Sequence, residues 1–249
     1  YDIIILTETW LVESISSSEF IDGRYTVYRH DRSSVCDKTR GGSVLIAVRN
    51  DIPSASVSTS NNQNEEMFVS LSERFIIGTV YIPPNASNNL YMDHVDSVAF
   101  LRTNYPDTGI SVIGDFNLPH ISWQQNDTCN YLLAHHVNSI NEETICDNFA
   151  YLGLCQYNNV VNCNNRILDL CFCDSNLLLK RCSPLLREDE NHPALLLSVN
   201  EINICNQFSH INKSYYDFKN ASYYDINEFL ISVEWASLFH DKDCLNLKI

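Results

Sequence analysis

Several features that would define a class of protein are absent from this sequence. No apolar run approaches the ~18 residues of a membrane-spanning helix. The opening Y-D-I-I-I-L is too short for a signal peptide and lacks its basic flank. The ten cysteines include no C-x-x-C pair and no Cys/His spacing typical of a zinc finger. We therefore expect no membrane partner, and an intracellular protein, nuclear or cytoplasmic and not secreted, with reduced cysteines.

Positive charge is also scarce. The chain has 16 Lys and Arg against 31 Asp and Glu, and a formal net charge of −15. Proteins that bind phosphate backbones usually present a basic surface, so this balance argues against tight, autonomous binding of nucleic acid. Acidic residues gathered around a metal ion would account for only part of the excess.

The sequence does contain a regular pattern of strands and helices. Helices are predicted at 93–105, with Asp93 as the N-cap, and at 142–152, ended by Gly153. Short apolar runs, many of them β-branched, predict strands at 2–6, 43–48, 66–72, 75–82, 110–116, 154–161, 166–173 and 193–199. Strands with intervening helices indicate an α/β fold in which helices cover sheets.

The character of the sequence changes near residue 200, where polar, Asn- and Tyr-rich sequence begins. We expect a catalytic-type domain over 1–200. Residues 201–249 are expected to form a linker or connector with one amphipathic helix at about 225–239. Residue 1 is not Met and lies almost inside a strand, so we expect this chain to be a piece of a longer protein.

The stretch V-I-G-D-F-N carries the first chemical signal. Asp115 and Asn117 end an apolar strand, and residues two apart in a strand point to the same face. The two side chains can therefore address one small target. Taken alone, the stretch also fits a strand that runs into an Asx turn.

Other polar residues lie just before, at the end of or inside predicted strands, and α/β sheets place their ligand sites at strand ends. Each has a structural alternative, such as an exposed acid, a turn cap or a bonded aromatic. Acids, an amide, a phenol and a histidine at one sheet edge would suit metal-assisted hydrolysis of a phosphodiester. These residues are Glu8, Tyr81, Asp169, Asp189, Asn191 and His192.

Six motifs in this order resemble the endonuclease/exonuclease/phosphatase superfamily, and more closely the apurinic-type endonuclease domain of LINE-like non-LTR retrotransposons. They are L-T-E-T-W, R-G-G-S-V-L-I-A-V, V-Y-I-P-P, V-I-G-D-F-N, R-I-L-D-L-C-F and H-P-A-L, all within residues 1–200. The tail, Y-Y-D-F-K-N-A-S-Y-Y-D-I-N-E-F-L, is similar to the connector before a reverse transcriptase. The resemblance implies a four-layer α/β sandwich with two packed mixed sheets and helices outside.

The resemblance also implies roles for individual residues. Glu8 aligns with a metal-binding glutamate, and Asp115 with the aspartate that activates water. Asn117 aligns with the amide that holds the phosphate and that aspartate, and Tyr81 with a tyrosine that contacts the phosphate. Asp169 aligns with an acid that assists the leaving group or supports the site.

His192 aligns with the family's C-terminal histidine, and here the chain departs from the pattern. The usual S-D-H is E-N-H at 190–192, so we expect either Asp189 or Asn191 to be the partner of His192, with Asp189 also a candidate metal ligand. The family's first motif, an asparagine on the strand before Glu8, is absent, so that strand is expected to be missing.

The leading hypothesis is an endonuclease that depends on Mg²⁺, or on Mn²⁺, and nicks target DNA to prime reverse transcription. One alternative is a phospholipid or inositol-phosphate phosphodiesterase on the same fold, which the acidic charge favours. The other is a catalytically dead retrotransposon relic, which the two departures favour.

Overall fold

The computed structural model describes residues 1–31, 42–59, 64–126, 129–184, 189–199 and 222–234. The chain divides into two compact units, residues 1–206 and 207–249. The helices of the first unit are the 3-10 helix η1 (Ser17–Glu19), α1 (Asn88–Asn104) and α2 (Ile140–Tyr151). Its strands are β1 (Ile3–Thr7), β2 (Tyr25–His30), β3 (Val44–Arg49), β4 (Ser54–Val57), β5 (Glu65–Leu71), β6 (Phe75–Tyr81), β7 (Gly109–Asp115), β8 (Ser122–Gln125), β9 (Leu132–His135), β10 (Cys155–Gln156), β11 (Asp169–Cys173), β12 (Leu177–Arg181) and β13 (Leu195–Val199).

The strands form one large sheet and two small ones. The large sheet has the order β4-β5-β6-β7-β11-β10-β9-β8, and the small sheets are β1-β3-β2 and β12-β13. The pair β6 and β7 is parallel, and the other pairs are antiparallel. A parallel pair needs a crossover, and helix α1 supplies it between β6 and β7.

The close approach of β6 and β7 explains the glycine of V-I-G-D-F-N. A Cβ atom on Gly114 would lie 2.0 Å from the Val80 carbonyl oxygen, which no side chain tolerates. Glycine at this position therefore lets β7 run beside β6 and end at Asp115.

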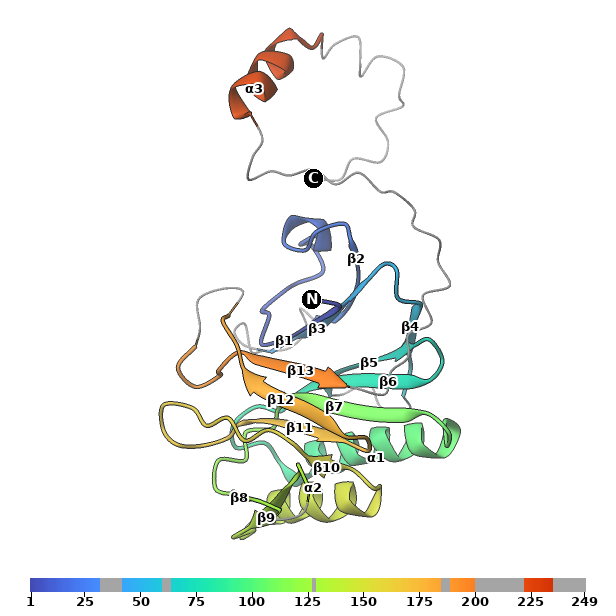
Figure 1. Ribbon diagram of the computed structural model, residues 1–249, viewed down its shortest axis with the longest axis vertical. Coiled ribbons are helices and arrows are strands. Elements are labelled where there is room, and N and C mark those ends of the chain that lie inside the picture. Colours follow the sequence, from blue (N-terminus) through green and yellow to red (C-terminus); the bar gives the residue numbers. More distant parts are fainter. Residues whose placement is uncertain (32–41, 60–63, 127–128, 185–188, 200–221, 235–249) are drawn as a thin grey trace. The chain divides into compact units, whose positions relative to one another are not determined.

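Two hydrophobic cores lie on opposite faces of the large sheet. On one face, α1 and α2 pack against residues such as Val112 and Phe116, and Figure 1 shows both helices along this face. On the other face, Ile77 and Ile113 pack against the small sheets, including Ile46 of β3. The expected mixed α/β class, with packed sheets and flanking helices, is confirmed. In the described residues, the helix beside the small sheets is the short η1. That a first strand is missing before β1 stays a prediction.

The two predicted helices exist, but α1 begins earlier than expected. Its N-cap is Ser87 and not Asp93, because the residues before Asp93 also face the core, and Tyr91 is only 1% exposed. Helix α2 begins with the capping box of Ser139 and Glu142, and a left-handed Gly153 follows it.

The strands after α2 are shorter than predicted. The expected strand 154–161 is reduced to Cys155–Gln156. The strand ends there because the Asn158 side-chain oxygen accepts the backbone N–H of Val160 and turns the chain. Asp169 therefore begins β11 instead of lying inside a strand. Strands β2, β4, β8, β9 and β12 were not predicted.

The second unit has one described helix, α3 (Tyr223–Ser232), which is shorter than the predicted 225–239. Ser222 is its N-cap, and its oxygen accepts the N–H of Asp225. Residues 235–239 of the prediction lie outside the described residues. Among the residues that are described, no helix has the length and apolar character to cross a membrane.

Candidate active site

A row of four polar side chains crosses the large sheet at the end of β7. Glu65 pairs with Tyr81, Tyr81 with Asp115, and Asp115 with Asp169. Residues paired directly across strands lie on the same face, so the sheet register brings these four together. The row continues the line of Ile77 and thus faces the small sheets.

Asp115 and Asn117 form one hydrogen-bonded unit. The Asn117 backbone N–H donates to Asp115 Oδ1 at 3.0 Å, and its side-chain amide donates to Oδ2 at 2.7 Å. The same amide also donates to the Ile82 carbonyl oxygen at 2.9 Å. Asn117 has φ +49°, a left-handed conformation that asparagine tolerates better than most residues. The turn thus places the amide of Asn117 over the carboxylate of Asp115.

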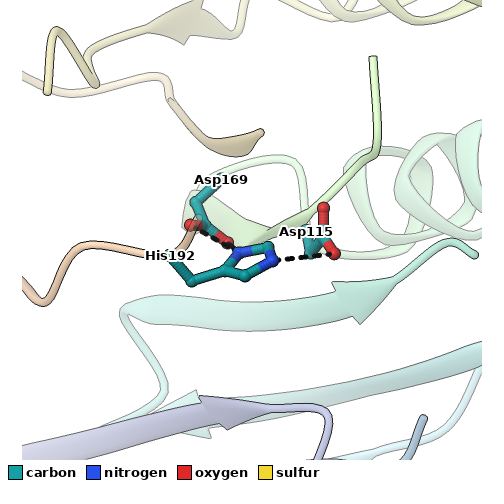
Figure 2. A group of neighbouring side chains, drawn as sticks. All are labelled: Asp115, Asp169 and His192. Atoms are coloured by element: carbon teal, nitrogen blue, oxygen red, sulfur yellow. Dashed lines mark hydrogen bonds and ion pairs between the residues drawn. The ribbon is translucent and has the colours of Figure 1, made fainter. Parts of the chain in front are cut away.

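His192 lies between the two aspartates of the row, as Figure 2 shows. Its Nδ1 is 3.0 Å from Asp169 Oδ2 and 3.2 Å from Oδ1, and its Nε2 is 3.9 Å from Asp115 Oδ2. Asp169 is held in turn by Asn158, whose side-chain amide donates to the Asp169 carbonyl oxygen at 2.6 Å. The imidazole therefore bridges two carboxylates from adjacent strands.

The surroundings shift the proton affinities of both groups in the direction that catalysis requires. Burial, followed by the charge of Asp169, raises the pKa of Asp115 to about 7. The hydrogen bond to Asp169 raises the pKa of His192 to about 9, against the opposing effect of burial. Between these two values Asp115 is an available base and His192 is a cation.

Tyr81 and Glu8 form a second pair beside Asp115. Burial, then the hydrogen bond to Glu8, raises the pKa of Tyr81 well above its usual range, so its hydroxyl remains a donor. Glu8 follows β1 with φ +50°, and Trp10 has φ +54°. The backbone N–H of Trp10 donates to the Gly42 carbonyl oxygen at 3.1 Å and secures this turn. The structure thus brings Glu8 and Tyr81 to the same edge as Asp115.

The expected partner of His192 is corrected. Asp189 accepts the backbone N–H of Asn191 at 2.7 Å and so caps the turn before His192. The Asn191 side-chain oxygen lies 3.2 Å from the Asn164 amide. Neither residue hydrogen-bonds the imidazole, because Asp169 occupies the Nδ1 position. The Asp189 carbonyl oxygen accepts the backbone N–H of His192 at 3.2 Å, and the charge of the Asp189 carboxylate is the smallest of the causes that raise the pKa of the imidazole.

Sequence reasoning missed Glu65, the fourth member of the row. One of its carboxylate oxygens accepts the backbone N–H of Ser43 at 2.7 Å, and its charge also raises the pKa of Tyr81. The signal that could have indicated Glu65 is that two consecutive glutamates, Glu65 and Glu66, open β5. Glutamates are uncommon at the end of a buried strand.

Three residues of this site could hold a metal ion. Asp115, Asp169 and His192 each offer a ligand atom, and these atoms lie within 4.8 Å of one another. Two carboxylates fit a hard divalent cation, whereas a protonated imidazole does not coordinate. The residues therefore suit a metal bound chiefly by oxygen, with His192 as a neighbouring positive charge.

A buried base, a cationic histidine and an oxygen-rich edge at the ends of strands are the features of an enzyme that hydrolyses phosphate esters. The chain belongs to the Endonuclease/Exonuclease/phosphatase family, whose model matches residues 1–198. The predicted family is confirmed, and it supports a phosphodiester hydrolase. A search of curated protein sequences found no match.

Two solved structures are similar to this chain. The chain is similar to the endonuclease domain of TRAS1, a telomere-specific non-LTR retrotransposon, with 11% sequence identity and a TM-score of 0.50 over 80% of this chain and 86% of that one. It is also similar to the human Nocturnin catalytic domain, with 12% identity and a TM-score of 0.43 over 79% of each chain. At these identities the likeness concerns the fold alone.

Proposed function

We propose that this chain is a metal-dependent DNA endonuclease domain that nicks one strand of a duplex. The observation that carries the proposal is the row of Tyr81, Asp115 and Asp169 with His192 between the two aspartates. The resemblance of its motifs to retrotransposon endonucleases supports DNA as the substrate. The nick would leave a 3′-hydroxyl from which reverse transcription is primed. We expect the enzyme to select its target sequence only modestly.

In this proposal each residue has a distinct task. Asp115, held by the amide of Asn117, accepts a proton from the attacking water. The His192 cation, held by Asp169, neutralises the charge that develops on the phosphate, and the Tyr81 hydroxyl donates to a phosphate oxygen. The water oxygen bonds to phosphorus while the P–O3′ bond breaks, and the water proton moves to the buried Asp115 carboxylate. The departing 3′-oxygen takes a proton from solvent and becomes the 3′-hydroxyl, while donors on the other elements hold the phosphate.

The cofactor that we propose is Mg²⁺ or Mn²⁺. When bound, it supplies additional positive charge at the phosphoryl oxygens. Glu8 and the carboxylates of Asp115 and Asp169 are the residues of this chain that would hold it. This donor set favours hard cations over zinc.

A second candidate substrate is a small phosphodiester, either a phospholipid head group or an inositol phosphate. The net charge of −15 favours it, because an acidic protein repels a DNA backbone more strongly than a small ester. We also propose reduced cysteines and an intracellular location, with residues 201–249 as a connector.

Nicking of supercoiled plasmid in Mg²⁺ tests the proposal. We expect relaxed circles whose nicks a DNA polymerase extends, no product in EDTA, and no product from Asp115→Ala. Asp96→Ala, on the exposed face of α1, is the matched control and should retain activity.

Three outcomes would contradict the proposal. Equal nicking by the wild type and Asp115→Ala would show that the activity does not come from this site. Hydrolysis of lipid or inositol esters without nicking would favour the second candidate, and no hydrolysis of any of these substrates would indicate a relic.

A further inference from the structure

Phe116 lies between the two residues of the D-x-N unit and points to the opposite face of the sheet. Asp115 and Asn117 address the site, whereas the Phe116 side chain is completely buried in the core beneath α1 and α2. Its backbone N–H donates to the Leu168 carbonyl oxygen at 3.1 Å. The position of this one residue therefore affects both catalytic neighbours.

Tyr91 of α1 holds the Phe116 backbone from the helix side. Its hydroxyl, in a side chain only 1% exposed, donates to the Phe116 carbonyl oxygen at 3.0 Å. A buried carbonyl oxygen that loses its hydrogen-bond donor is left without a partner, which is unfavourable, so the bond to Tyr91 holds the Phe116 carbonyl in place. Helix α1 thus reaches the peptide between Phe116 and Asn117.

His94, one turn further along α1, fixes the Phe116 ring. The two ring centroids are 5.6 Å apart in a T-shaped contact. The imidazole is itself held, because its Nδ1 lies 2.7 Å from the Glu66 carboxylate, whose other oxygen accepts the Ser97 hydroxyl at 2.5 Å. His94 and Ser97 have no exposed surface, so the imidazole is enclosed by the core and held there by its bond to Glu66.

Asn117 needs this support because its backbone is left-handed. This region is unfavourable for a non-glycine residue, which keeps that conformation only when its surroundings hold it. If the Phe116 peptide relaxed, Asn117 would move, and both of its hydrogen bonds to Asp115 would lengthen.

We propose that Tyr91 and His94 are positioning residues for the D-x-N unit. Through Phe116 they hold Asn117 against the Asp115 carboxylate, although neither touches the site. The kinetic consequence rests on the proposed function, whereas the structural consequence does not.

Tyr91→Phe tests this inference, because it removes one hydroxyl and leaves the buried ring. We expect kcat for plasmid nicking to fall about fivefold to tenfold, while KM for DNA changes less than twofold. We also expect amide hydrogen exchange at Asn117, followed by NMR, to become about tenfold faster, because its N–H donates to Asp115.

Tyr28→Phe is the matched control. It also removes a hydroxyl bonded at 3.0 Å, here to Ser54, which lies on a different strand pair. It should change neither kcat nor exchange at Asn117. All rates are compared at least 15 °C below the unfolding midpoint of each variant, so that the unfolded fraction is negligible.

His94→Gln is the second variant, because a glutamine amide can still donate to Glu66 but has no ring to place against Phe116. We expect the same pattern, with a larger fall in kcat. If Tyr91→Phe leaves either kcat or Asn117 exchange unchanged, or if Tyr28→Phe has an equal effect, the inference is wrong. If the wild type does not nick DNA, the proposed function fails and Asn117 exchange alone decides the positioning role.

Discussion

The hydrogen bond between His192 and Asp169 should set the alkaline limit of activity. Asp169→Asn retains an oxygen that can accept the Nδ1 proton but removes the negative charge. Because Asp169 is the largest cause of the raised pKa, the pKa of His192 should fall from about 9 towards its ordinary 6.5.

The structure sets the size of this effect. A fall in the pKa of His192 from about 9 to 6.5 corresponds to a loss of roughly 3 kcal/mol of favourable interaction, at 1.36 kcal/mol per pKa unit. Because the His192 side chain is 31% exposed, screening by solvent reduces this to about 2 kcal/mol. With an ordinary pKa, only about a tenth of His192 would be cationic at pH 7.5. We expect nicking to fall about tenfold at that pH and much less at pH 6.

Two measurements check this prediction. Proton NMR of the imidazole gives the pKa of His192 directly, and single-turnover nicking from pH 5.5 to 9.5 gives the alkaline limb. Asp174→Asn is the control, because Asp174 follows the same strand but pairs with Arg102. An unchanged pKa in Asp169→Asn, or an equal loss of activity at every pH, would refute the reasoning.

Three further predictions follow from the same geometry. In the folded chain the pKa of Asp115 is about 7, whereas an ordinary aspartate has a pKa of 3.8. The free energy of unfolding should therefore fall as the pH rises from about 4 to about 7. Asp115→Asn should remove that dependence. At pH 8 it should raise the free energy of unfolding by roughly 4 kcal/mol in urea titrations, at 1.36 kcal/mol per pKa unit, while abolishing nicking. Tyr81→Phe removes the hydroxyl bonded to Glu8 and should lower kcat about tenfold, with an unchanged melting temperature as the check on folding. Gly114→Ala places a Cβ 2.0 Å from the Val80 carbonyl oxygen and should destabilise the fold by about 3 kcal/mol or more, visible as a lower urea midpoint.

The sequence by itself determined some of the local elements of this protein. The β-branched run before Gly114 favours a buried strand, and the capping box of Ser139 and Glu142 favours the start of a helix at that point. Motif order within 1–200 was also sufficient for the family. These features depend on residues close together in the chain, which is why sequence patterns report them.

Tertiary structure alone decided which side chains meet. The partner of His192 is Asp169, 23 residues away, because β11 begins at that residue and lies beside β7. The same register adds Glu65, which no motif indicated. The start of α1 depends likewise on Tyr91 entering the core. Sheet register and helix packing are long-range properties, since a shift of one residue would turn every side chain of a strand to the other face. The sequence thus specified the chemistry of V-I-G-D-F-N, and the fold supplied the neighbours that make it a site.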